Sequence, residues 1–140
     1  MIRIEGRLDK VGKWWGVEIP ALRLNTQGRS RADALEMADD AVKMLAEDLG
    51  VKIPISIDPG AGSDFYVASG DVPGLLAFVM KRQRQKAGLS VRAAAKRLGA
   101  TSPTAYARYE KGSTEPGFSK VNALIEAVAP GSSLVISVGR

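Results

Sequence analysis

The sequence predicts an α+β domain followed by an all-α domain that ends in a short strand. Hydrophobic residues repeat at every second position near the N-terminus and at spacings of three and four after Gly70, which are the periods of strands and helices. The charge balance changes at the same place. Residues 1–70 hold 9 Lys and Arg against 11 Asp and Glu, whereas residues 71–140 hold 11 against 4. We therefore expect two domains, residues 1–70 and residues 71–140.

Three strands are expected before residue 30. The segment MIRIEGRLDK alternates apolar and charged residues, and WWGVEIP and ALRLNTQG continue the alternation. The KVGK turn and Pro20 separate the three runs, so an antiparallel meander is expected. Alternation places Trp14 and Trp15 on opposite faces, one in the core and one at a contact surface. Coverage of both by the domain's own helix and loops is the alternative.

A helix is expected between Ser30 and Gly50. Ser30 and Asp33 have the spacing of a capping box. VKIPISIDPGAGSD is predicted to be a turn-rich connector and DFYVAS another strand, which gives the order β-β-β-α-β for the first domain. The apolar stripe of the helix is formed by Leu35, Ala38, Val42, Leu45 and Leu49.

The second domain is expected to hold a series of helices that end at glycines. The first helix lies in VPGLLAFVMKRQRQKAG and ends at Gly88, and Ser90 caps the next, Val91 to Leu98. Ser102 caps a third helix that ends at Gly112. The last helix lies in STEPGFSKVNALIEAV, with Phe118, Val121, Leu124 and Ile125 expected to face inward.

The two short helices on either side of Gly99 have the layout of a helix-turn-helix, in which the second helix enters the DNA major groove. Tyr106 and Tyr109 would anchor that helix, leaving small polar side chains and Arg108 outward. A plain helical bundle is the alternative. Further cations of the second domain, if they touch DNA, are expected to add electrostatic attraction: Lys81, Arg82 and Lys86.

RQRQKAGLSVRAAAKRLGATSPTAYARYEKGSTEP resembles the Cro/repressor-type helix-turn-helix of the Xre family over about residues 75–128. The resemblance implies that Arg84 pairs with Glu110 inside the domain, and that Arg92 or a neighbouring cation contacts phosphate. Two departures are Ala94, where leucine is usual, and one additional residue after Gly99. The matching residues are Arg84, Gly88, Leu89, Ser90, Ala95, Leu98, Gly99, Glu110, Gly112 and Pro116. The expected DNA contacts are Arg92, Ser102, Thr104, Ala105, Arg108 and Lys111.

The arrangement of the two domains is similar to a narrower family. IPALRLNTQGRSRADALEMADDAV matches the strand–TQG–helix passage of the HicB antitoxins of HicAB toxin–antitoxin systems. The resemblance implies a partial, catalytically inactive ribonuclease-H-like N-terminal domain that binds and masks a small HicA-like ribonuclease toxin. It also implies a C-terminal domain that dimerises and represses its own operon. The acidic balance of residues 1–70 suits a basic, RNA-cleaving partner.

The composition limits the chemistry. The chain has no cysteine and no histidine, which removes the thiolate nucleophile, the usual general base and the common zinc ligands. Most carboxylates of the first domain lie on the polar face of its helix, so no enzyme, metal site or cofactor is expected. There is no signal pattern and no apolar run of the roughly 20 residues that span a bilayer. We expect a soluble cytoplasmic protein without a membrane partner.

The tail SSLVISVGR alternates apolar residues as a strand does. Because a lone strand is unstable, we expect it to pair with the same strand of a second copy, with DFYVAS of its own chain as the alternative. The resulting homodimer, which could pair into a tetramer, would bind a palindromic operator with its reading helices about 34–36 Å apart.

Two other functions stay open at this point. The first is a stand-alone transcriptional regulator with a ligand-binding N-terminal domain, which an apolar pocket between Trp15 and the first helix would favour. The second is an active ribonuclease-H-like nuclease, which would need carboxylates that converge on metal ions.

Overall fold

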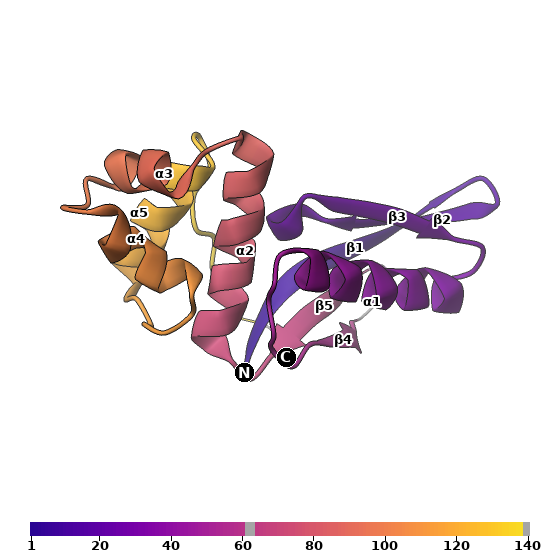
Figure 1. Cartoon of the computed structure of the whole chain (residues 1–140). Helices are drawn as coiled ribbons and strands as arrows, with labels where there is room; N and C mark the ends of the chain where they lie inside the picture. The colour runs from indigo at the N-terminus through magenta and orange to yellow at the C-terminus, as the bar shows by residue number, and fades with distance from the viewer. Residues whose placement is uncertain (61–63, 139–140) are drawn as a thin grey trace.

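A computed structural model describes residues 1–60 and 64–138 of the chain and shows a five-stranded sheet beside a group of helices (Figure 1). The N-terminal half contains β1 (Ile2–Val11), β2 (Trp14–Ile19), a 3-10 turn (Pro20–Leu22), β3 (Leu24–Gly28), α1 (Arg31–Asp48), β4 (Ser56–Pro59) and β5 (Asp64–Ser69). The C-terminal half contains α2 (Val72–Ala87), α3 (Val91–Leu98), α4 (Pro103–Glu110) and α5 (Phe118–Val128). The predicted α+β half and helical half are both present.

The sheet is antiparallel throughout and has the strand order β3-β2-β1-β5-β4. Alternation buries Leu8, Val17 and Phe65 on the face that packs in the core with α1. Because β3 and β4 are the two edge strands, α1 carries the chain from one edge of the sheet to the other. The two tryptophans separate as predicted. Trp15 packs against this core, and Trp14 on the opposite face is 36% exposed.

Helix α1 begins at the predicted serine. The Asp33 N–H donates to Ser30 Oγ over 3.0 Å, while the Asp33 carboxylate accepts from the Arg29 N–H over 2.8 Å. The carboxylate thus satisfies a donor one residue before the one expected in a capping box. Gly28 of the TQG segment is required by packing, since a Cβ there would lie 2.4 Å from the Ala34 nitrogen. The glycine therefore lets the first turn of α1 approach the end of β3.

The predicted connector between α1 and β5 contains a strand, β4, that the sequence does not predict. Residues of β4 pair with β5 in register, with Ile57 opposite Val67. The proline at the end of this four-residue strand and the glycine after it gave the segment the composition of a turn. Proline is tolerated here because β4 is an edge strand. Residues 61–63 of the predicted connector lie outside the described residues.

Helix α2 stands between the sheet and the other helices (Figure 1). Leu75 and Phe78 belong to the core beneath the sheet, whereas Met80 belongs to the core of the helical half. The second core also holds Tyr106 and Leu124. The predicted domain boundary at residues 70/71 thus falls just before a helix that is part of both cores.

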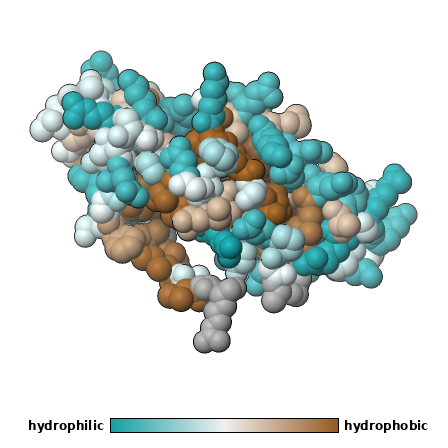
Figure 2. Space-filling view, turned by 90° about the horizontal axis from the view of Figure 1, so that it is seen from below, coloured by the Kyte–Doolittle hydropathy of each residue, from teal (hydrophilic) through white to brown (hydrophobic). Residues whose placement is uncertain are grey.

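The C-terminal tail forms no strand within the single chain, so the alternative of pairing with DFYVAS is wrong, and pairing with a second copy stays a prediction. Residues 132–138 form no strand, and β5 pairs with β1 and β4 rather than with the tail. The Leu134 N–H is held by the Asn122 side chain at 2.9 Å, but the following apolar residues are exposed, with Val138 at 96%. Figure 2 shows these apolar side chains standing away from the body of the molecule. Alternation of apolar side chains does not form a strand unless a second strand pairs with it. Residues 139–140 lie outside the described residues.

Candidate DNA-binding site

Helices α3 and α4 form the helix-turn-helix, and local sequence signals define both ends of the turn. Gly99 ends α3 in the left-handed conformation, with φ of 77°, which glycine adopts at little cost. Ser102 caps α4, because its Oγ accepts the Ala105 N–H at 3.3 Å, and Pro103 occupies the first turn. The additional residue after Gly99 is accommodated in this turn, and α4 starts at the predicted position.

Helix α4 presents its predicted outer residues to solvent. Tyr106 is fully buried and Tyr109 is half-buried, so both anchor the helix as expected. On α3, Ala94 and Ala95 are buried, and Ala94 fills the place where leucine is usual in the related motif. Of the six predicted DNA contacts, Ala105 is half-exposed. The other five are exposed: Arg92, Ser102, Thr104, Arg108 and Lys111. The Ser102 oxygen already accepts a backbone hydrogen bond, which leaves its hydroxyl proton for an outside acceptor.

The predicted pair between Arg84 and Glu110 is present and joins α2 to the end of α4. Arg84 Nε donates to Glu110 Oε2 at 2.6 Å and Nη2 donates to Oε1 at 3.0 Å, the two-point geometry that favours arginine. Arg84 Nη1 also donates to the Leu89 carbonyl at 2.9 Å. The Glu110 side chain is buried and its hydrogen bond raises the pKa of Arg84. This pair positions α4 and is unavailable to DNA.

Tyr106 brings a hydroxyl into the same core. The oxygen is buried and has no hydrogen-bond partner among the described residues. Burial raises the pKa of Tyr106 far above its ordinary value, and the nearby Glu110 carboxylate adds to the shift. The tyrosine is therefore neutral, and its role in the helix-turn-helix is packing.

A hollow of about 350 Å³ lies beside α4, between the α3–α4 turn and the start of α5. Arg108, which was predicted, lines it together with Thr101, Thr114 and Lys120, which were not. Two cations and two hydroxyl side chains are groups that contact phosphates. Thr114 and Lys120 come after the end of α4, so the helical period of α4 does not predict that they lie beside it. Only the folded chain brings them beside Arg108.

Two cations predicted to add attraction to DNA are used inside the protein instead. Lys81 Nζ donates to the Leu49 carbonyl at 3.0 Å. Arg82 donates to the carbonyls of Leu22 and Arg23, at 2.9 and 3.3 Å. These bonds tie α2 to the N-terminal half. Lys86, one turn later, is exposed.

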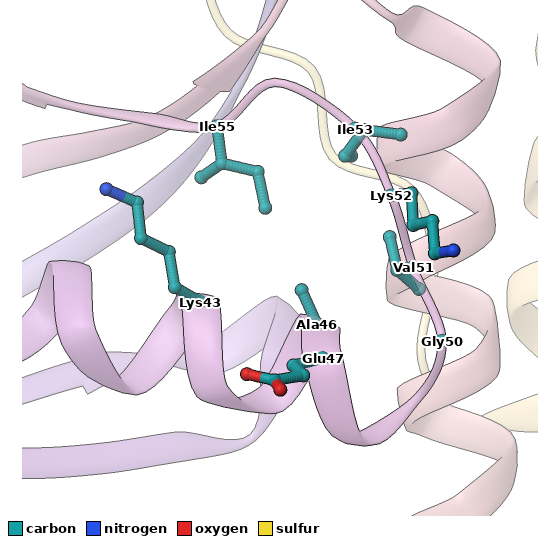
Figure 3. Close-up of a pocket in the computed structure, with 8 residues that line it drawn as sticks. All are labelled: Lys43, Ala46, Glu47, Gly50, Val51, Lys52, Ile53 and Ile55. Atoms are coloured by element: carbon teal, nitrogen blue, oxygen red, sulfur yellow. The ribbon is translucent and has the colours of Figure 1, made fainter.

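The N-terminal half contains a hollow of about 260 Å³ between the end of α1 and residues 50–55 (Figure 3). Its lining combines apolar side chains with charged ones: Ala46, Val51, Ile53 and Ile55, with Lys43, Glu47 and Lys52. It is not the pocket between Trp15 and the helix that would favour a ligand-binding regulator. Within residues 1–60 and 64–138, no group of three or more acidic side chains is placed to hold a metal ion.

Comparison with known proteins supports the same site. Residues 80–128 match the family model described as Helix-turn-helix, which spans the end of α2 through α5. The match does not include the sheet or α1. A search of curated proteins found no match. In the part of the chain that the structure describes, no helix is long and apolar enough to cross a membrane. Residues 80–128 are thus a helix-turn-helix of the kind found in sequence-specific DNA-binding regulators.

Proposed function

We propose that the protein is an antitoxin of the HicB type, which binds and neutralises a small HicA-like ribonuclease and represses its own operon. The main support is the helix-turn-helix, with α4 exposing Thr104 and Arg108 beside Lys120. The second support is the acidic α+β half, which resembles the HicB N-terminal domain in its strand–TQG–helix passage. The protein acts by binding alone, and its N-terminal domain is a partial ribonuclease-H-like fold without catalytic activity.

The proposed repressor is a homodimer that binds a palindrome. Each copy contributes one α4 to the major groove, and two half-sites about one helical turn apart fix the spacing of the two helices at about 34–36 Å. The tails pair to connect the copies, because residues 134–138 alternate apolar side chains and residues 135–138 are in no strand of their own chain. Antiparallel pairing of one segment with its own copy satisfies both strands through a two-fold axis.

The proposal is tested with the small reading frame that neighbours the gene. Its product is expressed alone and together with this chain, and growth and co-purification are scored. We expect arrest by the neighbour alone, with rescue and a purified complex when both are made. A neighbour that is harmless, or that does not bind, contradicts the antitoxin function, and binding of the purified chain to its own upstream region then measures the repressor function separately.

A further inference from the structure

The outer face of α1 exposes two large apolar side chains in an acidic surrounding. Met37 is 37% and Met44 is 65% exposed, and their spacing of seven residues places them on one side of the helix. Glu36, Asp40 and Asp48 are exposed and flank them. We call these five residues the acidic methionine face. Flexible methionine side chains suit a surface that adapts to a partner.

The charges of this face are unfavourable in the isolated chain. Glu36 and Asp40 are four residues apart, where like charges destabilise a helix. Asp48 lies in the last turn, where a cation is favoured and α1 has none. Among the described residues none of these three carboxylates forms an ion pair, since Lys43 pairs with Asp39 at 2.8 Å. An arrangement that opposes helix stability is explained if positive charge arrives from outside.

The open face of the sheet is the other candidate surface, and two of its carboxylates already pair with arginines of the same face. Glu5 pairs with Arg7 at 3.5 Å and Asp58 with Arg3 at 3.4 Å. Arg29 lies over the exposed Trp14 ring, 5.9 Å from its centroid. Cations are therefore present on this face before any partner binds. The acidic methionine face, by contrast, contains no cation among its five residues.

We propose that the acidic methionine face is the docking surface for a basic protein surface, with the methionines covering an apolar side chain and the carboxylates pairing with lysines or arginines around it. This proposal rests on the antitoxin function, and it assigns the toxin to α1. A ribonuclease must attract RNA phosphates with clustered cations. Its active surface is therefore positively charged and complementary to the acidic methionine face. Docking there would occupy the cations that the toxin needs for RNA.

The test uses the full chain and the product of the neighbouring reading frame. Asp40→Lys places a lysine four residues after Glu36, and Asp48→Lys places a cation in the last turn, so each variant should melt at the same or a higher temperature. Each should bind the neighbour about 10- to 100-fold more weakly, because like charges then meet across the interface. Met44→Ala, which leaves the charge unchanged, should weaken binding by removing the apolar contact.

Asp9→Lys is the matched control, since it makes the same charge change on the open face of the sheet. We expect its affinity for the neighbour to stay within about three-fold of the wild-type affinity. The small loss comes from the weaker long-range attraction of a less negative chain. Wild-type affinity in the α1 variants, or a greater loss in Asp9→Lys than in Asp40→Lys, overturns the docking surface while leaving the antitoxin function in place. Absence of binding by the wild type contradicts the antitoxin function itself, and the docking proposal with it.

Discussion

Arg108 is the residue on which sequence recognition should depend most. It is the sole cation of α4, it is exposed, and it lies beside the small side chains Thr104 and Ala105 that let the helix approach base edges closely. Its place in the hollow with Lys120 also brings it near a cation of the kind that contacts phosphate. Base reading and phosphate contact differ in their consequences and can be separated by mutation.

Replacing Arg108 with alanine should weaken binding to the operator by about 1–3 kcal/mol and relax specificity at one base pair, as expected for loss of a two-point contact to guanine. Binding is measured on the operator and on single-base variants, with Lys120→Ala as the phosphate control. An equal loss on every sequence would assign Arg108 to the backbone instead.

Tyr106 gives a second residue-scale prediction. Replacing it with phenylalanine removes a buried hydroxyl that has no partner in the described chain, while the ring keeps its packing. Because an unsatisfied buried hydroxyl is unfavourable, the free energy of unfolding should stay the same or rise by up to about 2 kcal/mol. Chemical denaturation measures it. A clear decrease would mean that the hydroxyl forms a hydrogen bond in solution.

At this scale the sequence predicts anchors better than contacts. The burial of Tyr106 and the Arg84–Glu110 pair follow from spacing and from the family resemblance. Phe118 was expected to face inward but is 76% exposed. It is the first residue of α5, next to the cap at Gly117, and lies beyond the core that Leu124 and Val128 enter. Periodicity gives a direction around a helix and not the length of helix that the core covers.

At the scale of elements, Lys81 and Arg82 of α2 bind the N-terminal half of the chain. Arg82 hydrogen-bonds to carbonyl groups at the end of the 3-10 turn, and Arg23 there adopts the left-handed conformation with φ of 46°. An arginine that holds such a backbone contributes to stability rather than to attraction of DNA. Lys86 is exposed on the next turn of the same helix and provides the comparison.

Arg82→Ala should lower the free energy of unfolding by about 1–3 kcal/mol, since it leaves carbonyls of the N-terminal half without their charged donor. It should leave the salt dependence of operator binding unchanged. If Lys86 contacts a phosphate, Lys86→Ala should reduce that slope by about one with little effect on stability. If both variants reduce the salt dependence of operator binding by the same amount, Arg82 contacts DNA as Lys86 does, and its role is not confined to stability.

Most elements could be predicted because their ends carry explicit signals. Ser30, Ser90 and Ser102 each accept a backbone N–H at the start of a helix, and β1 and β2 alternate as predicted. The third predicted strand begins later than expected, because Leu22 belongs to the 3-10 turn and β3 starts at Leu24. Strand β4 could not be predicted in the same way. Its four residues are too few for a period, and their pairing is decided by β5, which follows later in the chain.

At the scale of the whole molecule, the exposed residues 135–138 of the tail are in no strand of the described chain. If the proposed dimer forms through the tail, deleting residues 132–140 should convert it to a monomer and weaken operator binding, because two half-sites then bind independently. Ile136→Asp is the full-length companion variant, since it disrupts apolar pairing without shortening the chain. Light scattering measures the mass. An unchanged dimer in both variants contradicts pairing through the tail.

The tail also marks the limit of prediction at this scale. The alternation at Leu134, Ile136 and Val138 is a property of the sequence, but a strand exists only where a second edge offers hydrogen bonds. The relation of the two halves was equally hidden. The spacing of Leu75, Phe78 and Met80 places the third on the opposite side of the helix from the first two, but it does not indicate that the two sides enter separate cores.

That sharing within α2 has a consequence for how such a protein could be recombined. A gene fusion that joined a new DNA-binding domain after residue 70 would remove Leu75 and Phe78 and expose the apolar face of the sheet. One that joined it after α2 would impose Met80 and Arg84 on a foreign core. Exchange of DNA-binding domains between relatives would therefore succeed only where the incoming helix already carries side chains for both cores, that of the sheet and that of the helical half.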